Sequence, residues 1–281
     1  MKHIRNILLA VLILTTLGGC TAAEPSNTSA QKEQRTLYTT VIQNSGEDES
    51  AEKYLEIAER SQTLFPLLEE QVGLFVLNTY NYQDVDGEGT PLYTMNTLHA
   101  PAEIDPNGKS IQVSRNFFVY YPIETASGSS IEDALSDDDL TLNVLVPEQY
   151  RAQEETLRAA WLAQFFLEKV EAENSYCEWA GRAERSRLTQ DQLSLNLIYV
   201  KDGQKYPVLR EGCVSEDGWI TDPVVEVYTG NVHCNYAHSL LSQWSYFYAD
   251  TDDPKEAFEL LRPSVEACGA AESFQKVEPA G

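Results

Sequence analysis

The first twenty residues limit what the rest of this chain can become. Lys2 and Arg5 give a short basic start, and residues 7–14 form an unbroken apolar run. That run contains no acidic residue and is too short to cross about 30 Å of hydrocarbon. A basic start followed by a short apolar stretch is typical of an export signal, which is removed and takes no part in the fold. The pattern therefore predicts a domain that folds outside the cytoplasm.

The end of this segment, Leu17-Gly18-Gly19-Cys20, resembles the lipobox of bacterial lipoproteins. By that resemblance, residues 1–19 are the signal peptide and Cys20 carries the lipid, such as palmitate, as the first mature residue. An ordinary secretory signal with a chance cysteine is the alternative. Residues 20–35 are rich in Ser, Thr, Ala and Gln and cannot bury enough apolar surface to fold, so we expect a flexible tether. The predicted location is the extracytoplasmic side of the cell membrane.

The charge balance restricts the partners of the folded part. The chain has 44 acidic and 20 basic side chains, a formal net charge of −24. Nucleic acid is not an expected partner, because phosphate binding requires a basic surface. Anionic lipid should also repel the folded part. No other apolar run of about 18 residues occurs, so contact with the membrane is expected through the lipid alone.

Four cysteines remain in the predicted folded part, an even number that suggests two disulfides in an exported chain. They allow three pairings. A hairpin centred on Asp202-Gly203 would place Cys213 near the point where the chain arrives from Cys177. This argument favours the pairs Cys177–Cys213 and Cys234–Cys268. No Cys-x-x-Cys motif occurs, which argues against a redox or structural zinc site.

Hydrophobic patterning predicts alternating strands and helices. Runs of β-branched and aromatic residues predict strands at 36–43, 74–82, 92–98, 111–123, 140–146, 193–199, 206–209, 224–228, 244–248 and 274–277. Apolar residues at helical spacing predict helices at 49–64, 147–173, 236–243 and 254–268. Pro66 should break or kink the first helix. The expected fold class is α+β, with mixed sheets and packed helices in two ferredoxin-like or mixed α/β subdomains, 36–132 and 133–281.

A search for catalytic or binding motifs gives little. No Gly-x-Gly-x-x-Gly or Gly-x-Ser-x-Gly motif occurs. His233 and His238 are five residues apart and would not share a helix face. Asp84, Asp86 and Glu88 resemble a calcium loop that lacks its terminal glutamate. We therefore expect no catalytic residue, no metal and no cofactor.

Two aromatic clusters offer a candidate interaction face. The aromatic side chains in question are Phe117, Phe118, Tyr120, Tyr121, Trp244 and Tyr246. The alternative is that each cluster is a strand with one side in the core, because strands favour aromatic residues.

Several segments resemble the extracytoplasmic region of bacteriocin-associated integral membrane proteins, which are ABC permeases of the macrolide-exporter type. The similar segments are Asn116-Phe117-Phe118, residues 142–150, residues 198–206, Asp222-Pro223-Val224-Val225 and residues 253–258. The resemblance spans about residues 36–277 and carries no catalytic residue. Those permeases have transmembrane helices on both sides of this region, and this sequence has none.

The sequence thus predicts a lipid-anchored interaction or accessory module, with an ABC permease or a secreted bacteriocin-like peptide as the implied partner. One alternative is a solute-binding lipoprotein, which lipidation and two α/β units would suit. A surface hydrolase is the second alternative, although the expected motifs are missing.

Overall fold

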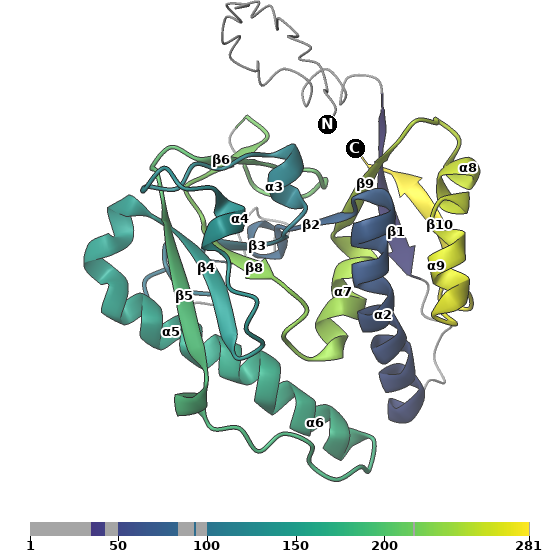
Figure 1. The fold of residues 1–281 in the computed structure, drawn as a ribbon, viewed down its shortest axis with the longest axis horizontal. Coiled ribbons are helices and arrows are strands. Elements are labelled where there is room, and N and C mark those ends of the chain that lie inside the picture. The colour runs from purple at the N-terminus through teal and green to yellow at the C-terminus, as the bar shows by residue number, and fades with distance from the viewer. Residues whose placement is uncertain (1–34, 43–49, 84–92, 94–99, 216, 281) are drawn as a thin grey trace, which may run out of the picture.

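A computed structural model of the chain describes residues 35–42, 50–83, 93, 100–215 and 217–280. They form a mixed eight-stranded sheet, a small two-stranded sheet and packed helices, so the predicted α+β class is confirmed (Figure 1). The large sheet has the order β10-β1-β9-β2-β3-β8-β4-β5. Its strands are β1 (Thr36–Ile42), β2 (Phe75–Asn78), β3 (Ser110–Ser114), β4 (Thr141–Pro147), β5 (Ser194–Val200), β8 (Val224–Tyr228), β9 (Ser245–Ala249) and β10 (Phe274–Pro279). The small sheet pairs β6 (Lys205–Pro207) with β7 (Trp219–Thr221).

The large sheet interleaves the two ends of the chain. β1 lies between β10 and β9, and β2 lies between β9 and β3. Two neighbouring pairs are parallel, β3 with β8 and β4 with β5, and the remaining pairs are antiparallel. Strands from the predicted units 36–132 and 133–281 therefore share one sheet, and residue 133 does not divide the described chain into separate sheets.

The two faces of the sheet carry separate cores. One core joins the sheet to α2 (Ala51–Val72), α5 (Glu154–Phe166), α7 (Cys234–Gln243), α8 (Pro254–Glu259) and α9 (Arg262–Ala267). The other joins it to α3 (Phe117–Tyr120), α4 (Ile131–Ala134) and the small sheet. In β8, Val224 belongs to the first core and Val225 to the second. The middle of the sheet is therefore covered on both sides.

Helix α2 runs through the position at which we predicted a break. The Ser50 side chain caps its start by accepting a hydrogen bond from the backbone N–H of Lys53. Gly73 ends it in the left-handed conformation, with φ of 64°. Pro66 lies inside the helix, and the buried Phe65 and Leu68 pack against the sheet on either side of it. Tertiary packing of this kind outweighs the local cost of proline. Figure 1 shows α2 lying beside α7.

The second long helical segment changes its winding along its length. A 3₁₀ segment, η3 (Glu148–Gln153), leads into α5, and α6 (Ala172–Trp179) ends the segment. Between α5 and α6, η4 (Leu167–Glu171) has π-helical hydrogen bonding. A π-helical turn inserts an extra residue and rotates the side chains that follow it, and such turns are frequent at functional sites.

None of the helices in the described ranges combines the length and the apolar character needed to cross a bilayer.

The predicted hairpin at Asp202-Gly203 is wrong, and the predicted cysteine pairs lose their basis. β5 pairs in parallel with β4, while β6 pairs with β7, so the chain does not return along β5. Cys213 lies instead beside Thr79, with 3.3 Å between its Sγ and Thr79 Oγ1. Neither Cys177–Cys213 nor Cys234–Cys268 is formed in the structure, in which Cys177, Cys234 and Cys268 are free thiols.

Several sequence predictions fall partly or wholly outside the described residues, among them the signal peptide 1–19 and the tether 20–35, of which Arg35 alone is described. The others are the lipidation site at Cys20, the incomplete calcium-like loop at 84–88 and the strand at 92–98, of which Tyr93 alone is described.

Candidate functional site

A carboxylate lies in the middle of the most thoroughly buried part of the sheet. Glu226 is the central residue of β8, and its side chain points to the face covered by α5 and α7. Only 6% of Glu226 is exposed. Gln112 of β3 is its neighbour across the parallel pair, and Asn78 of β2 is the neighbour of Gln112. The three polar residues therefore form a row across adjacent strands.

Hydrogen bonds connect this row and end on the carboxylate. Asn78 Nδ2 donates to Gln112 Oε1 at 3.4 Å, and Gln112 Nε2 donates to Glu226 Oε1 at 2.5 Å. Asn78 thus orients the amide of Gln112, and Gln112 supplies one hydrogen-bond donor to Glu226 Oε1.

A second carboxylate reaches the same region from the helical layer. Glu168 belongs to the π-helical η4 and is 4% exposed. Gln164 Nε2 donates to Glu168 Oε1 at 2.7 Å, and Asn107 Nδ2 donates to Gln164 Oε1 at 3.4 Å. The arrangement repeats that of the sheet: an asparagine, a glutamine and a buried glutamate. The other oxygen, Glu168 Oε2, is buried and receives no hydrogen bond from any described residue.

The two carboxylates line a cavity of about 270 Å³ between the sheet and the helices α5 and α7. Polar groups and aromatic rings share its walls. Besides the two glutamates, the lining includes Asn78, Tyr80, Asn107, Gln112, Trp161, Gln164, Tyr236, Ser239 and Trp244. Trp161 is fixed in place because its indole Nε1 donates to the backbone oxygen of Ile104 at 3.0 Å. Small-molecule sites combine apolar walls with a few converging polar groups in this way.

Burial shifts the titration of both glutamates. Desolvation raises the pKa of Glu226 to about 7, although the hydrogen bond from Gln112 lowers it in part. Desolvation also raises the pKa of Glu168 well above its ordinary value, and the charge of Glu226 raises it further. A negative charge in a low-dielectric surrounding disfavours a second one nearby. The pair therefore retains a proton at neutral pH more readily than exposed glutamates do.

The carboxylate pair has no cationic partner among the described residues. Ion pairs elsewhere in the described chain link arginine, lysine or histidine to other acidic residues, and none includes Glu168 or Glu226. The inner segments outside the described ranges, 43–49, 84–92, 94–99 and residue 216, contain no lysine or arginine and one histidine, His99. Buried charges in proteins are usually paired or neutralised. This pair is available to a positive group from outside the protein.

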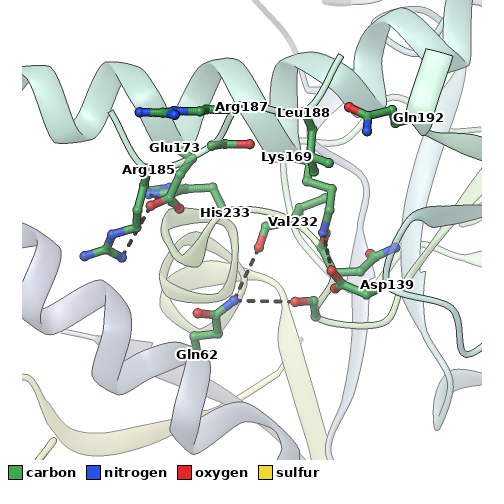
Figure 2. A pocket seen from close by; sticks show the side chains of 13 residues that line it. Gln62, Asp139, Lys169, Glu173, Arg185, Arg187, Leu188, Gln192, Val232 and His233 are labelled. Atoms are coloured by element: carbon green, nitrogen blue, oxygen red, sulfur yellow. Dashed lines mark hydrogen bonds and ion pairs between the residues drawn. The ribbon is translucent and has the colours of Figure 1, made fainter. Parts of the chain in front are cut away.

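Figure 2 shows a second, larger hollow of about 650 Å³, to which the next residue of η4, Lys169, contributes. Lys169 Nζ lies 2.8 Å from Asp139 Oδ2, and an Arg185 terminal nitrogen lies 3.3 Å from Glu173 Oε1. Gln62 Nε2 donates to the backbone oxygens of Gly230 and Val232, at 3.4 and 3.3 Å. These four charged side chains are paired within the protein, whereas Glu168 and Glu226 form no ion pair with a described residue.

The two histidines singled out in the sequence have separate structural roles. His233 is the N-cap of α7 and lies 3.6 Å from Glu173 Oε2 through its Nε2. His238 lies inside α7, with its Nδ1 3.2 Å from Ser61 Oγ. Within the described ranges, no group of three or more His, Cys, Asp or Glu side chains could hold a metal ion.

The predicted aromatic interaction face belongs largely to the core. Phe117, Trp244 and Tyr246 are at most 2% exposed. Phe118, Tyr120 and Tyr121 are partly buried and pack with Phe117 and Tyr246 on the second face of the sheet. Trp244 lies in the first core, on the other face. The six side chains therefore do not form one exposed surface. The alternative, a strand with one side in the core, describes Tyr246 in β9, whereas Phe117, Phe118 and Tyr120 belong to the helix α3.

Sequence reasoning passed over both glutamates of the cavity, although each interrupts an apolar pattern. Glu226 stands within Val224-Val225-Glu226-Val227-Tyr228, where every neighbour is buried. Glu168 follows Trp161 by seven residues and Phe165 by three, which places it on the apolar stripe of the helix. A charged residue at a core position is the signal that could have identified the site.

Comparisons of the chain with protein-family models, with curated proteins and with solved structures found no match.

Proposed function

We propose that this protein is a lipid-anchored extracytoplasmic binding protein that receives a small solute in the cavity between Glu168 and Glu226. The observation that carries the proposal is the unpartnered oxygen Glu168 Oε2, buried at the wall of a cavity beside a second buried carboxylate. When Glu168 is ionised, this oxygen is a buried acceptor without a donor, which costs about 1–3 kcal/mol. A bound solute that donates to this oxygen would recover that cost.

The position of the cavity supports binding of a small molecule rather than of a protein surface. Its polar groups come from three strands, from the helical segment α5–η4 and from α7, so they converge on one cavity that is open to solvent on one side. Tyr80, a residue that is 52% exposed, lines the cavity at the solvent side. A volume of about 270 Å³ admits a small solute and excludes a folded partner.

A thermal-shift screen of the full-length protein tests the proposal. The panel contains amino acids, sugars, organic acids, amines and short peptides. At least one class should raise the melting temperature in a saturable way, because a ligand that binds only the folded state stabilises it. The recovered ligand should be chemically unchanged; recovery as hydrolysis products would favour the surface-hydrolase alternative.

Two variants of α7 locate the binding. Ser239 lines the cavity and is exposed, so Ser239→Trp should block the cavity without disturbing the core. Gln243 is exposed on the same helix and does not line the cavity, so Gln243→Trp is the matched control. A shift that persists in Ser239→Trp, or a panel without any shift, would contradict the proposal.

We further propose, on the sequence resemblance alone, that the protein acts beside an ABC permease or a secreted peptide. In such a complex, the solute bound in the cavity would be the molecule that the protein presents or senses. Crosslinking in intact cells should capture the permease or the peptide.

A further inference from the structure

We propose that the solute is a small primary amine, bound as its ammonium ion between Glu168 and Glu226. This inference rests on the function proposed above and names the chemical class of the ligand.

The charge of the site selects a cation. Both carboxylates are more than nine-tenths buried, and no described lysine, arginine or histidine forms an ion pair with either. Desolvating two carboxylates without a counter-charge is costly, and the cost falls when a positive group enters between them. A neutral or anionic solute would leave that cost in place or increase it.

The free hydrogen-bonding capacity of the site selects a donor with several N–H groups. Oε1 of each glutamate already accepts from a glutamine amide, Gln164 for Glu168 and Gln112 for Glu226. Glu168 Oε2 accepts from no described residue. An ammonium group carries three donors and no acceptor, and a carboxylate offers about four lone-pair positions. One N–H can therefore satisfy Glu168 Oε2 while another reaches the carboxylate of Glu226.

The neighbours of the carboxylates argue against a metal ion. Hard cations such as calcium take six to eight oxygen ligands. Here the groups closest to the two carboxylates, the amides of Gln112 and Gln164, present nitrogen donors rather than oxygens. No metal-binding group of three acidic, histidine or cysteine side chains exists in the part of the chain that the structure describes.

The remaining walls suit the carbon chain of an amine. The rings of Trp161, Tyr236 and Trp244 line the cavity together with the carboxylates. The charges of Glu168 and Glu226 both raise the pKa of Tyr236, after the larger effect of its own burial, as expected for a ring close to the pair. Aromatic faces attract cations and cover aliphatic groups. Carboxylates at one side and aromatic rings at the other thus match the two ends of an alkylammonium ion.

Release of a proton from the glutamate pair on binding would distinguish an ammonium ion from a neutral ligand. The titratable side chains that line the cavity are Tyr80, Glu168, Glu226 and Tyr236. Where the glutamate pair still holds a proton, an entering ammonium ion displaces it. Alkylammonium ions themselves stay charged up to about pH 10, as lysine does. Affinity should therefore rise between pH 6 and pH 8 as the carboxylates ionise.

Calorimetry with the full-length protein provides the test. The probes are the alkylamines from methylamine to butylamine, the alcohols of equal length, and calcium chloride. At least one amine should bind at pH 8 at least tenfold more tightly than its alcohol, and calcium should not compete with it. At pH 6.5, the observed heat should depend on the ionisation enthalpy of the buffer, because binding releases a proton.

Variants of the two glutamates test whether their carboxylates bind the amine. Glu168→Gln and Glu226→Gln should each lower amine affinity at least tenfold, while Glu155→Gln, an exposed glutamate on α5, should leave it unchanged. An alcohol or calcium that binds as well as any amine would overturn the inference. The inference would also be overturned if a neutral or anionic solute from the thermal-shift panel bound and Ser239→Trp blocked its binding. In that case the proposed binding function would stand. If no solute binds at the cavity, both proposals fail.

Discussion

Replacing Glu226 by glutamine should stabilise the protein above neutral pH, and the size of the effect follows from its burial. In the unfolded chain a glutamate titrates near 4.5, whereas burial in β8 raises the pKa of Glu226 to about 7. Below pH 4.5 both states hold the proton and no penalty exists. Between pH 4.5 and 7 the unfolded chain loses the proton while the folded protein keeps it, so the free energy of unfolding falls as pH rises.

Above about pH 7 both states are ionised and the penalty no longer grows. Because a pKa difference of one corresponds to 1.36 kcal/mol, the full penalty at pH 8 is about 3 kcal/mol. Glu226→Gln keeps the shape of the side chain, accepts the hydrogen bond of Gln112 through its amide oxygen, and cannot ionise. The variant should therefore exceed the natural protein in stability by up to about 3 kcal/mol at pH 8, and by little at pH 5.

Urea unfolding followed by tryptophan fluorescence at pH 5, 6, 7 and 8 measures this difference. Glu155→Gln, on the exposed side of α5, is the matched control and should change the unfolding free energy by less than about 0.5 kcal/mol at every pH. The reasoning would be refuted if Glu226→Gln were less stable than the natural protein at pH 8, or if its effect were the same at pH 5 and pH 8. Stabilisation together with lost amine binding would show that the carboxylate is kept for its ligand at the expense of stability.

Three further outcomes are expected. Cys20→Ala should move the protein from the membrane fraction to the soluble fraction, and continued membrane association would contradict the lipid assignment. Cys234 should react far more slowly than Cys268 with an alkylating reagent at pH 8 in the folded protein, because burial raises the pKa of the Cys234 thiol to about 12; peptide mapping by mass spectrometry measures both rates. The hydroxyl of Tyr206 is buried and accepts or donates no hydrogen bond with a described residue, so Tyr206→Phe should unfold at equal or higher urea concentration. A clear loss of stability would show that the hydroxyl has a partner.

Local sequence patterns were sufficient to place most of the regular elements. Alternation of apolar and polar residues located β4, and the Asp253-Pro254 pair marked the start of α8, where the Asp253 side chain caps the backbone N–H of Lys255. These signals depend on residues adjacent in the chain, which is why they could be read without a structure.

The errors arise where distant contacts decide the local structure. The segment Phe117–Tyr120 has the aromatic composition of a strand but forms the short helix α3. The side chain of Asn116 donates to the backbone oxygens of Glu69 and Leu74, 47 and 42 residues earlier, and so holds this segment against the end of α2. No local pattern contains that contact.

The cavity was missed for a related reason. Glu226 and Glu168 are far apart in the sequence and line one cavity only because β8 lies inside the sheet and η4 lies in the helical layer beside it. The order of strands in the sheet depends on pairings between remote segments, such as β3 with β8, which periodicity does not specify. Each glutamate alone resembles an ordinary charged residue, and only their proximity in the folded protein marks them as a candidate binding site.

The pairing of β1 with β10 has a consequence for how the chain acquires its structure. β1 receives hydrogen bonds along both of its sides, from β9 and from β10, and the second of these partners ends at Pro279. Among the described strands, β1 must therefore wait for β10, a strand far later in the sequence, before the backbone groups on that side are satisfied. Pairing between segments so far apart in the sequence generally slows folding. Until then β1 offers an unpaired edge to other chains, so truncation before Phe274 should yield an aggregation-prone product rather than a smaller working domain.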